Sequence, residues 1–512
     1  MAAVQGEAQR DGERAGAGPV ALAGRRVAVV GLGKSGLAVA RFAAARGAHV
    51  IACDDRDEAQ LAQGLAAIEP HVRGGRIILR LGGLTAEALT SADLIVLSPG
   101  VPPLRPAVVA ARAAGVPITG EIELASRFIA APIVGVTGTN GKSTVTSLCG
   151  AIAARTGRPS FCGGNLGTPL IDAVDTAAAG PGGLVVVELS SYQLETAETL
   201  RCTAATILNL TPDHLDRYPS LREYGEAKAR IFYNMPALAT RVLNAGDKEV
   251  EALYERTCGV GLPALWFSTS GSLPPQMFME RPLRIGGFVD GGDLVLRGAA
   301  GFARLAAGEP IDTERYPLSE IALVGRHNQA NLLAALLLMR ASGLATREEA
   351  LAAVREFRAL PHRMQLIGEA AGVRYYDDSK GTNVDAVVAG LDGFPEPLVL
   401  IAGGRDKGGS YEPLRRVLAR NQTRGVIVLG EAAPLIEQAL AGCDFPVRHA
   451  ASMEEAVRSA TALCQPGDAV VLSPACSSFD MFRDYAHRAA VFCAAVASLP
   501  AAHMHVPPSG HA

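Results

Sequence analysis

The stretch GVTGTNGKST, residues 135–144, joins an apolar run, residues 133–136, to a segment that predicts a helix. A turn between a buried strand and a helix presents unpaired backbone N–H groups at the positive end of the helix dipole, where phosphate oxygens bind. Gly138 and Gly141 allow the backbone to wrap closely around such a group. The stretch therefore predicts an α/β fold with a phosphate-binding loop.

The residues of this loop indicate ATP with magnesium. Lys142 is placed to reach the β- and γ-phosphates, and the Ser143 hydroxyl is placed to bind magnesium. The pattern G-x-x-x-x-G-K-[ST] has glycine where this chain has Val136, so the literal motif fails although its strand–loop–helix context is kept. An incidental turn is the alternative. We predict ATP contacts from Gly138, Thr139, Asn140, Gly141, Lys142, Ser143 and Thr144.

Two further apolar runs of the same block end in residues that bind metal ions. Glu188 follows the run 184–187, and His214 lies shortly after the run 205–208. The carboxyl ends of parallel strands form the ligand-binding edge of an open α/β sheet. We therefore predict Glu188 as a magnesium ligand and His214 as a second, softer one. A salt-bridged glutamate and a structural histidine are the alternatives.

Apolar strands alternate with helical segments in three blocks, as is typical of parallel sheets. Residues 24–120 and 360–499 are predicted as Rossmann-like domains, and residues 121–359 as a P-loop ATPase-like α/β domain with a β-rich extension around the hairpin signal Asp290-Gly291-Gly292-Asp293. Residues 1–23 and 500–512 are expected to be a disordered leader and tail. We expect a long helix at 328–340 and strands at 26–30, 48–53, 94–97, 133–136, 184–187, 205–208, 373–376, 398–402, 426–429 and 469–472.

Charge and cysteine content exclude several classes of protein. The 512-residue chain has a formal net charge of −3, whereas a general nucleic-acid-binding or membrane-surface protein would normally have an excess of basic residues. Its 9 cysteines form no CxxC pair, which is typical of reduced thiols in a cytoplasmic protein. No apolar run is long enough for a membrane span, so we expect no membrane insertion.

A second glycine-rich loop, Gly31-x-Gly33-x-x-Gly36, follows the first strand and opens a helix. Asp54 lies about twenty residues further on, as in dinucleotide-binding folds. Taken alone, this loop indicates NAD binding, but no later block supplies the residues of a dehydrogenase. The diphosphate of a nucleotide-linked substrate and a tight turn without a ligand are the alternatives.

Three strand ends of the third block have polar clusters: DDSKGTN at 377–383, GGRDKG at 403–408 and SPACSSFD at 473–480, and Leu360-Pro361-His362-Arg363 precedes them. Basic residues and hydroxyl groups at one sheet edge suit a small anionic substrate. One such cluster is often an ordinary loop, whereas three on one edge favour a binding site.

Together, these motifs resemble the Mur ligase family, whose members add amino acids to the peptidoglycan precursor, over about residues 24–499. The loop TGTNGKST is shared by this family and by folylpolyglutamate synthases. Narrower motifs resemble the branch that adds D-glutamate: GLGKSG (31–36), SPGVP (98–102), GGNLGTPL (163–170), VELSSYQLE (187–195), TPDHLDRY (211–218), DDSKGTN (377–383), GGRDKGG (403–409) and SPACSSFDMF (473–482).

The resemblance implies a role for each position. The first domain would bind the UDP part of a substrate, with contacts from Gly33, Lys34, Ser35, Asp54, Asp55, Arg56, Ser98, Gly100, Asn165 and Ser190. The implied catalytic residues are Lys142, Glu188, His214 and Lys228, and the implied magnesium ligands are Ser143, Glu188, His214 and Lys228 as a carbamate. The nucleotide would also contact Asn328, Asn331, Arg363 and Asp378, and D-glutamate would contact Lys380, Thr382, Lys407, Ser478 and Phe479. By its sequence context alone, Lys228 is an ordinary exposed lysine.

The implied reaction joins D-glutamate to UDP-N-acetylmuramoyl-L-alanine at the expense of ATP, with two Mg²⁺ ions, by a cytoplasmic monomer that serves cell-wall synthesis, cell shape and division. Val384-Asp385-Ala386 and Arg405 depart from the family pattern and bear on the details of D-glutamate binding. The alternatives are a sibling ligase for another amino acid, a folylpolyglutamate synthase, a nucleotide sensor without turnover and, more distantly, an NAD-dependent dehydrogenase.

Overall fold

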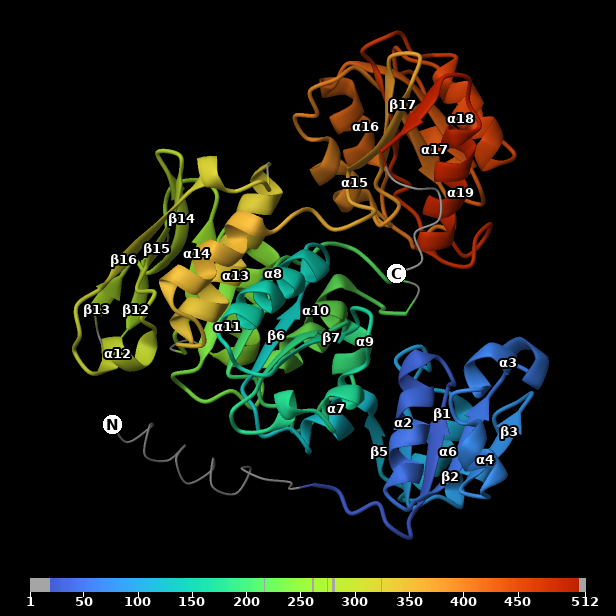
Figure 1. Ribbon diagram of the computed structural model, residues 1–512, viewed down its shortest axis with the longest axis vertical. Coiled ribbons are helices and arrows are strands. Elements are labelled where there is room, and N and C mark those ends of the chain that lie inside the picture. The colour runs from blue at the N-terminus through green and yellow to red at the C-terminus, as the bar shows by residue number, and fades with distance from the viewer. Residues whose placement is uncertain are drawn as a thin grey trace. The chain divides into compact units, whose positions relative to one another are not determined.

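The computed structural model describes residues 19–215, 217–259, 262–273, 275–278, 281–323 and 325–505. The chain forms two compact units: one contains Met1–Leu210 and Arg222–Phe357, and the other contains Thr211–Leu221 and Arg358–Ala512 (Figure 1). Residues 211–221, which the sequence analysis included in the central domain, therefore group with the C-terminal unit. Residues 1–18 and 506–512 of the expected leader and tail lie outside the described residues.

The first unit begins with a parallel five-stranded sheet of order β3-β2-β1-β4-β5. Its central strand, RVAVV, is buried after its first residue, as expected for a strand that is covered on both faces. The strands are β1 (Arg26–Val30), β2 (His49–Asp54), β3 (Ile77–Leu81), β4 (Leu94–Leu97) and β5 (Ile118–Gly120). The helices are α2 (Lys34–Ala45), α3 (Glu58–Leu65), α4 (Glu69–Arg73), α5 (Ala86–Thr90) and α6 (Pro106–Ala113).

A nine-stranded sheet of order β16-β15-β14-β11-β10-β9-β6-β8-β7 follows in the same unit. Its strands from β6 to β11 run parallel, and α8 packs against α13 and α14. The strands are β6 (Ile133–Thr137), β7 (Ser160–Gly164), β8 (Leu184–Glu188), β9 (Ala204–Ile207), β10 (Thr240–Asn244) and β11 (Leu265–Ser268). The helices are α7 (Glu121–Ser126), α8 (Lys142–Arg155), α9 (Ser191–Leu194), α10 (Leu221–Ala229), α11 (Lys248–Cys258), α13 (Arg326–Ala341) and α14 (Arg347–Glu356), with the short 3₁₀ turns η1 (Leu170–Ala173), η2 (Ala177–Ala179) and η3 (Arg230–Phe232).

The β-rich extension is formed by β14 (Gly286–Asp290), β15 (Asp293–Arg297) and β16 (Thr313–Pro317), which extend the nine-stranded sheet in antiparallel pairs. The hairpin expected at Gly291-Gly292 is confirmed, since β14 and β15 pair directly across these two residues. A separate antiparallel ribbon of β12 (Gln276–Phe278) and β13 (Arg281–Leu283), the helix α12 (Phe302–Ala306) and η4 (Leu318–Glu320) complete this region.

The second unit contains a seven-stranded sheet of order β21-β20-β19-β22-β18-β17-β23, parallel except where β17 pairs with β18 and β23. The strands are β17 (Gln365–Ala370), β18 (Val373–Asp377), β19 (Leu398–Gly403), β20 (Thr423–Leu429), β21 (Val447–His449), β22 (Ala469–Leu472) and β23 (Ala502–Met504). The helices are α15 (Val384–Leu391), α16 (Glu412–Arg420), α17 (Ala433–Ala439), α18 (Met453–Thr461) and α19 (Tyr485–Ala497).

The two expected terminal segments are partly ordered. Ala502–Met504, in the expected disordered tail, is a strand, because the free edge of β17 offers backbone hydrogen-bonding groups that the tail composition does not reveal. In the expected leader, Leu22 is buried. The expectation of disorder was therefore wrong for these residues.

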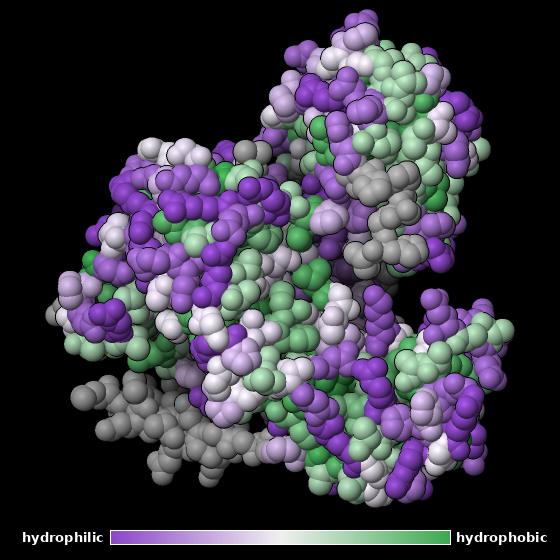
Figure 2. Space-filling view, viewed as in Figure 1, coloured by the Kyte–Doolittle hydropathy of each residue, from purple (hydrophilic) through white to green (hydrophobic). Residues whose placement is uncertain are grey.

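Parallel sheets in both units confirm the predicted α/β class, and every strand that was expected lies within one or two residues of its observed bounds, apart from β20, which starts three residues earlier. The division into three domains stays a prediction. Within the described ranges, no helix is long and apolar enough to cross a membrane. On the face drawn in Figure 2, hydrophilic and hydrophobic residues are interspersed.

Candidate functional site

The predicted phosphate loop, residues 138–141, connects β6 to α8 and is held by a neighbouring strand end. Asn209 Oδ1 accepts hydrogen bonds from the N–H groups of Thr139 (3.1 Å) and Asn140 (2.7 Å), and Asn209 Nδ2 donates to the Asn140 carbonyl oxygen (3.0 Å). Sequence reasoning assigned no role to Asn209. Its position directly after an apolar strand was the available signal.

Gly141 precedes the first residue of α8 and has a φ of +83°, a conformation that favours glycine. A Cβ atom at this position would lie 2.4 Å from Asn331 Oδ1, so a side chain here would have to displace that of Asn331 on α13. Asn331 Nδ2 in turn donates to Asn328 Oδ1 (3.4 Å). Of these two predicted nucleotide contacts, Asn331 therefore lies against the phosphate loop, and Asn328 is bonded to Asn331.

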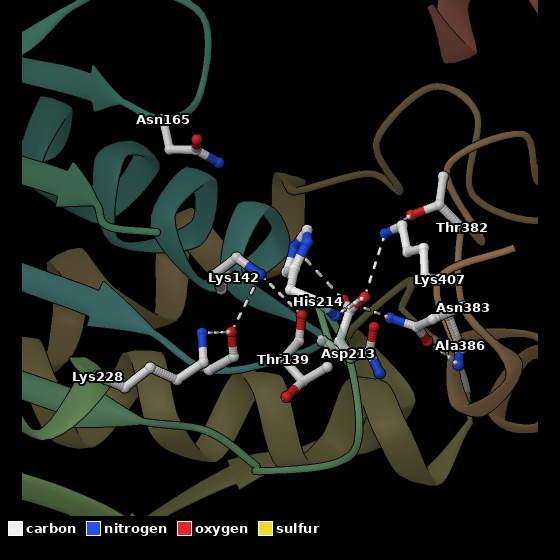
Figure 3. Close-up of polar contacts among 12 residues, drawn as sticks. Thr139, Lys142, Asn165, Asp213, His214, Lys228, Thr382, Asn383, Ala386 and Lys407 are labelled. Carbon is white, nitrogen blue, oxygen red and sulfur yellow. Dashed lines mark hydrogen bonds and ion pairs between the residues drawn. The ribbon is translucent and has the colours of Figure 1, made fainter. Parts of the chain in front are cut away.

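Two lysine side chains converge on one carbonyl oxygen of the loop (Figure 3). Lys142 Nζ donates to the carbonyl oxygens of Gly138 (3.0 Å) and Thr139 (2.7 Å), and Lys228 Nζ donates to the same Gly138 oxygen (2.8 Å). Lys228 is only 1% exposed, and its Nζ lies 4.4 Å from the centroid of the Tyr224 ring. The interpretation of Lys228 as an exposed lysine, drawn from its sequence context, was therefore wrong, because the pattern of α10 does not reveal that this face packs against the loop.

Glu188 lies at the carboxyl end of β8, beside the strand that leads into the loop, in register with Val136. Asn165 binds it twice, since its backbone N–H donates to the Glu188 carbonyl oxygen (2.9 Å) and its Nδ2 donates to Glu188 Oε1 (2.7 Å). The second carboxylate oxygen, Oε2, is buried and has no hydrogen-bond partner among the described residues. A buried carboxylate oxygen in this state is suited to a cation.

The residues at this point fit a magnesium ion. Glu188 is 2% exposed and Ser143 is 3% exposed, and both lie on elements that meet at the loop. In the part of the chain that the structure describes, no group of three or more His, Cys, Asp or Glu side chains could hold a metal ion. A magnesium ion here would therefore need oxygen ligands of other kinds, such as the Ser143 hydroxyl, phosphate oxygens or a modified Lys228.

The N-terminal glycine loop forms part of a cavity of about 390 Å³. Eight of the ten residues predicted to bind the UDP part line it: Gly33, Lys34, Ser35, Asp54, Asp55, Arg56, Ser98 and Gly100. Asn165 and Ser190 do not line it, and Ser190 instead caps α9 by accepting a hydrogen bond from the Gln193 N–H (3.2 Å). At Gly36, a Cβ atom would lie 1.8 Å from the Gly31 carbonyl oxygen, so this strand–helix turn requires glycine.

The polar wall of this cavity is fixed by internal hydrogen bonds. Asp54 accepts from the Leu32 N–H (2.7 Å) and from Arg56 Nε (2.9 Å) and Nη2 (2.8 Å). Burial raises the pKa of Asp54, but the hydrogen bonds from Arg56 and Leu32 outweigh it and hold that pKa at about 2. Arg105 pairs with Asp55 at the same wall. The cavity therefore presents charged groups of both signs in fixed positions.

In the C-terminal unit, the three predicted polar clusters meet at one sheet edge. The Ala475 N–H donates to the Gly381 carbonyl oxygen (2.9 Å), and Arg405 and Ser477 exchange backbone hydrogen bonds (2.9 and 3.1 Å). Arg488, which sequence reasoning did not assign, donates from Nη2 to the Ser379 carbonyl oxygen (2.8 Å) and from Nη1 to that of Cys476 (3.2 Å). The prediction that these clusters share one edge is confirmed.

Arg488 is 2% exposed, and burial lowers the pKa of its guanidinium to about 10. It is a single charged residue within the apolar helix α19, and that isolation was the signal in the sequence. Because its two hydrogen bonds end on different clusters, this buried cation fixes the spacing between them.

Lys407 pairs with Asp213, a residue of the segment 211–221 (Figure 3). Its Nζ lies 3.2 Å from Asp213 Oδ1 and 3.4 Å from Thr382 Oγ1, and Asn383 Nδ2 donates to Asp213 Oδ2 (3.3 Å). Asp213 is 5% exposed. Two of the predicted D-glutamate contacts, Lys407 and Thr382, are thus adjacent. The Lys407 ammonium already forms an ion pair within the chain, with the Asp213 carboxylate.

The other predicted amino-acid contacts lie differently. Lys380 Nζ lies 5.4 Å from the centroid of the Tyr485 ring, a contact that sequence reasoning missed because it joins separate segments. Ser478 is buried, whereas the Phe479 side chain is 64% exposed. The structure therefore places Phe479 mainly in solvent.

Asp378 and Arg363, both predicted to contact the nucleotide, lie close enough to interact. Asp378 is buried, accepts from the Met364 N–H (3.3 Å) and is bonded by the Ser473 hydroxyl. Burial raises the pKa of Asp378 to about 7, although the Ser473 bond and the charge of Arg363 act in the opposite direction. Arg363 Nε is buried without a hydrogen-bond partner among the described residues, which leaves a donor for a ligand.

His214 adopts a φ of +56°, which is uncommon for a residue other than glycine. Its N–H donates to Asp213 Oδ1 (3.0 Å), and its carbonyl oxygen accepts from the N–H groups of Arg217 and Tyr218 (3.0 Å each). These bonds fix His214 next to the carboxylate that pairs with Lys407. Its predicted place at a magnesium ion stays a prediction.

Comparison with known proteins finds matches to three domain models of one family along the chain. The Mur ligase MurD-like N-terminal domain matches residues 25–120, the Mur ligase middle domain matches residues 136–339, and the Mur ligase glutamate ligase domain matches residues 362–476. The UDP-N-acetylmuramoylalanine–D-glutamate ligase of Pelobacter propionicus is 46% identical over 479 residues, which cover 93% of this chain and 99% of that protein. The protein of the same name from Anaeromyxobacter dehalogenans is 44% identical over 475 residues, which cover 92% of this chain and 97% of that protein.

Two solved structures show the same fold at low sequence identity. The UDP-N-acetylmuramate–alanine ligase of Thermotoga maritima has a TM-score of 0.53 at 18% identity and covers 88% of this chain and 96% of its own. The MurF ligase of Thermotoga maritima, solved in complex with ADP, has a TM-score of 0.53 at 17% identity and covers 92% of this chain and 95% of its own. On the strength of the three matched domains and of relatives above 40% identity over nearly its whole length, the chain belongs to the Mur ligase family.

Proposed function

We propose that this Mur ligase joins D-glutamate to UDP-N-acetylmuramoyl-L-alanine, with conversion of ATP to ADP and phosphate, in the synthesis of the peptidoglycan precursor. The observation that supports it is that the relatives share the name UDP-N-acetylmuramoylalanine–D-glutamate ligase. Their alignments cover more than 90% of this chain, at 42–46% identity. The phosphate loop, Glu188 and Lys228 lie together in the structure, as this reaction needs. We place the reaction in the cytoplasm and expect a monomer.

The chemical problem of this reaction is that a carboxylate is a poor electrophile for an amine. The L-alanine carboxylate oxygen attacks the γ-phosphorus of ATP in line, and ADP leaves. The amine of D-glutamate then attacks the carbonyl carbon of the acyl phosphate. The tetrahedral intermediate collapses to the amide as phosphate leaves, and the proton that the nitrogen loses passes to phosphate or solvent. Lys142 stabilises the charge that develops on the transferred phosphoryl group. Magnesium held by Ser143, Glu188 and a carbamylated Lys228 would supply further shielding of this charge, with His214 at a second ion.

The three ligands are assigned to the three groups of residues described above. The UDP part occupies the cavity bounded by the N-terminal glycine loop. Asn165 and Ser190 contact the part of the substrate that extends beyond this cavity. ATP lies on the phosphate loop with Asn328, Asn331, Arg363 and Asp378 around its nucleoside. D-glutamate binds at the edge formed by Lys380, Thr382, Lys407, Ser478 and Phe479, where Lys407 exchanges Asp213 for a substrate carboxylate.

A panel of amino acids with ADP detection tests the proposal. Purified protein with ATP, Mg²⁺ and UDP-N-acetylmuramoyl-L-alanine is expected to release ADP with D-glutamate, and much less with L-glutamate, L-alanine or a diamino acid. Omission of the UDP-linked substrate should abolish the signal. Equal or faster ADP release with another amino acid would instead assign the chain to a sibling activity, and release with a folate substrate would assign it to folylpolyglutamate synthesis. No release with any of them would favour a nucleotide sensor.

The Arg488→Lys variant is expected to raise the KM for D-glutamate about tenfold and to leave the KM for ATP within about twofold. Arg488 reaches the Ser379 and Cys476 carbonyl oxygens from two separate nitrogens of a rigid guanidinium, whereas a lysine has a single nitrogen. We therefore expect the lysine to lose or lengthen one of these charge-assisted hydrogen bonds and the two clusters to separate. Steady-state kinetics with each substrate varied in turn measures the effect. Arg483→Lys, an exposed arginine two residues before α19, is the matched control. Equal increases in all three KM values would show a general loss of structure instead.

A further inference from the structure

Helix α7 has two buried carboxylates that bind different backbone segments. Glu121 is 2% exposed, and its Oε1 accepts a hydrogen bond from the Ile171 N–H at 2.7 Å. Glu123 is 1% exposed, and its Oε2 accepts from the N–H groups of residues 198, 199 and 200 at 2.9, 2.9 and 3.1 Å. The helix follows directly on β5, the last strand of the N-terminal sheet. Neither carboxylate has a part in the chemistry proposed above.

The segment that Glu121 binds leads to the phosphate-loop side of the unit. Residues 165–169 connect β7 to η1, and Asn165 at one end of this connection donates two hydrogen bonds to Glu188. At the other end, the Ile171 N–H is bound by Glu121. The N–H of Gly164, the last residue of β7, donates to the Thr168 carbonyl oxygen (2.7 Å), which closes the connection into a tight loop. The Asn165 loop, residues 164–171, is thus held at its two ends by two buried carboxylates.

The same segment also contacts the helix that begins in the UDP cavity. Asp172, in η1, pairs with Arg41 of α2 (2.6 Å), and Asp175 pairs with Arg46 of α2 (2.7 Å). Helix α2 starts at Lys34, which lines that cavity. These ion pairs are partly exposed and contribute little on their own. The buried bond to Glu121 is therefore the stronger constraint on where η1 and the Asn165 loop lie relative to the cavity.

Packing alone does not account for a carboxylate at this point. Glu121 Oε2 is buried without a hydrogen-bond partner among the described residues, and Asp172 is near enough to disfavour a second negative charge. Burial raises the pKa of Glu121 to about 7, although the backbone N–H groups of Ile171 and Leu170 act in the opposite direction. An apolar side chain would avoid this cost but could not bind the backbone of η1.

We propose that Glu121 is a positioning residue for the UDP-linked substrate, since it fixes the Asn165 loop at the distance from the UDP cavity that this substrate spans. The proposal rests on the proposed function, in which Asn165 contacts the same substrate. Loss of the hydrogen bond between Glu121 and the Ile171 N–H leaves the phosphate loop and the proposed D-glutamate site intact. It allows Asn165 to move away from its place beside Glu188. The effect is therefore specific to one of the three substrates.

Binding of UDP-N-acetylmuramoyl-L-alanine without ATP, measured by calorimetry, tests this inference directly. Glu121→Met removes the acceptor and is expected to weaken binding about tenfold. Glu121→Gln keeps one acceptor oxygen without the charge and is expected to weaken it about threefold. In steady-state assays, the KM for this substrate should rise in the same order, with the KM values for ATP and D-glutamate unchanged and kcat within about twofold.

Glu123→Gln is the matched control, because Glu123 lies on the same helix and is equally buried but binds residues 198–200. It is expected to lower the melting temperature without a change in affinity for the UDP-linked substrate. Wild-type affinity in Glu121→Gln, or an equal loss of affinity in the Glu123 variant, would overturn the positioning role, even where Glu121→Met fails to fold. If the wild-type protein itself did not bind this substrate, the proposed function would fail and this inference with it.

Discussion

Replacement of Lys142 by alanine is expected to lower kcat for ADP release by about a hundredfold to a thousandfold, the range for the loss of one donor that stabilises charge in a transition state. In the structure, Lys142 Nζ donates to the Gly138 and Thr139 carbonyl oxygens, so it already lies over the loop that we assign to the phosphates. On this assignment, phosphate oxygens of bound ATP would replace these carbonyl oxygens as acceptors. Lys142 is expected to stabilise the transition state of phosphoryl transfer more than it stabilises bound ATP, because negative charge moves during the transfer. The variant should therefore lose more in kcat than in affinity for ATP.

The measurement is steady-state ADP release at saturating concentrations of all three substrates. Lys248→Ala is the control, because Lys248 is an exposed lysine at the first position of helix α11 in the same unit. Activity of Lys142→Ala within about threefold of the wild type would contradict the assignment of this loop to ATP.

Replacement of Lys228 by alanine is expected to abolish measurable turnover. Lys142 and Lys228 both donate to the Gly138 carbonyl oxygen, so their two ammonium groups lie close together and repel each other. Conversion of the Lys228 ammonium to a carbamate would replace this repulsion by attraction and would add oxygen ligands next to Glu188. A carbamate cannot donate to the Gly138 carbonyl or sit as a cation on the Tyr224 ring, so carbamylation must be accompanied by movement of this side chain.

One further variant and one rescue experiment separate the role of the carbamate from that of the positive charge. Lys228→Arg keeps the charge but cannot form this carbamate, and it is expected to be as inactive as Lys228→Ala. Addition of a short carboxylate such as acetate should restore part of the activity of Lys228→Ala, because the carboxylate can occupy the space that the side chain leaves. Intact-mass analysis in bicarbonate buffer should detect one added CO₂ on the wild type only. High activity of the Lys228→Arg variant would show that catalysis does not need a carbamate at this position.

Local sequence patterns were sufficient for the framework of the site. The strand β1 was predicted to the residue, and the glycine loop after it contributes part of the lining of the cavity. The strand β6 was predicted to within one residue, and the glycine-containing turn before α8 lies where it was expected. A buried strand, a glycine turn and a helix follow one another in a single short stretch, so their signals are all present in neighbouring residues.

Contacts between distant segments were not predictable in the same way. Lys228 was expected to be exposed, and Glu121 and Arg488 were not singled out, because each acts on backbone more than 45 residues away. The strand β23 is a further case, since its pairing depends on the free edge of β17 and not on its own composition. The resemblance to the Mur ligases supplied a role for Lys228, whereas it supplied none for the two residues that bind only backbone.

The pairing of Lys407 with Asp213 has a consequence for inhibitors of this enzyme. A compound whose carboxylate is aimed at Lys407 does not meet a free cation; it replaces one partly buried ion pair with another and must also leave Asp213 and Asn383 suitably solvated. Its gain in affinity from that charge is therefore small. A compound that keeps the Asp213 pair and binds alongside it, for example by hydrogen bonds to Asp406 or Ser410 in the adjoining cavity of about 130 Å³, avoids this exchange.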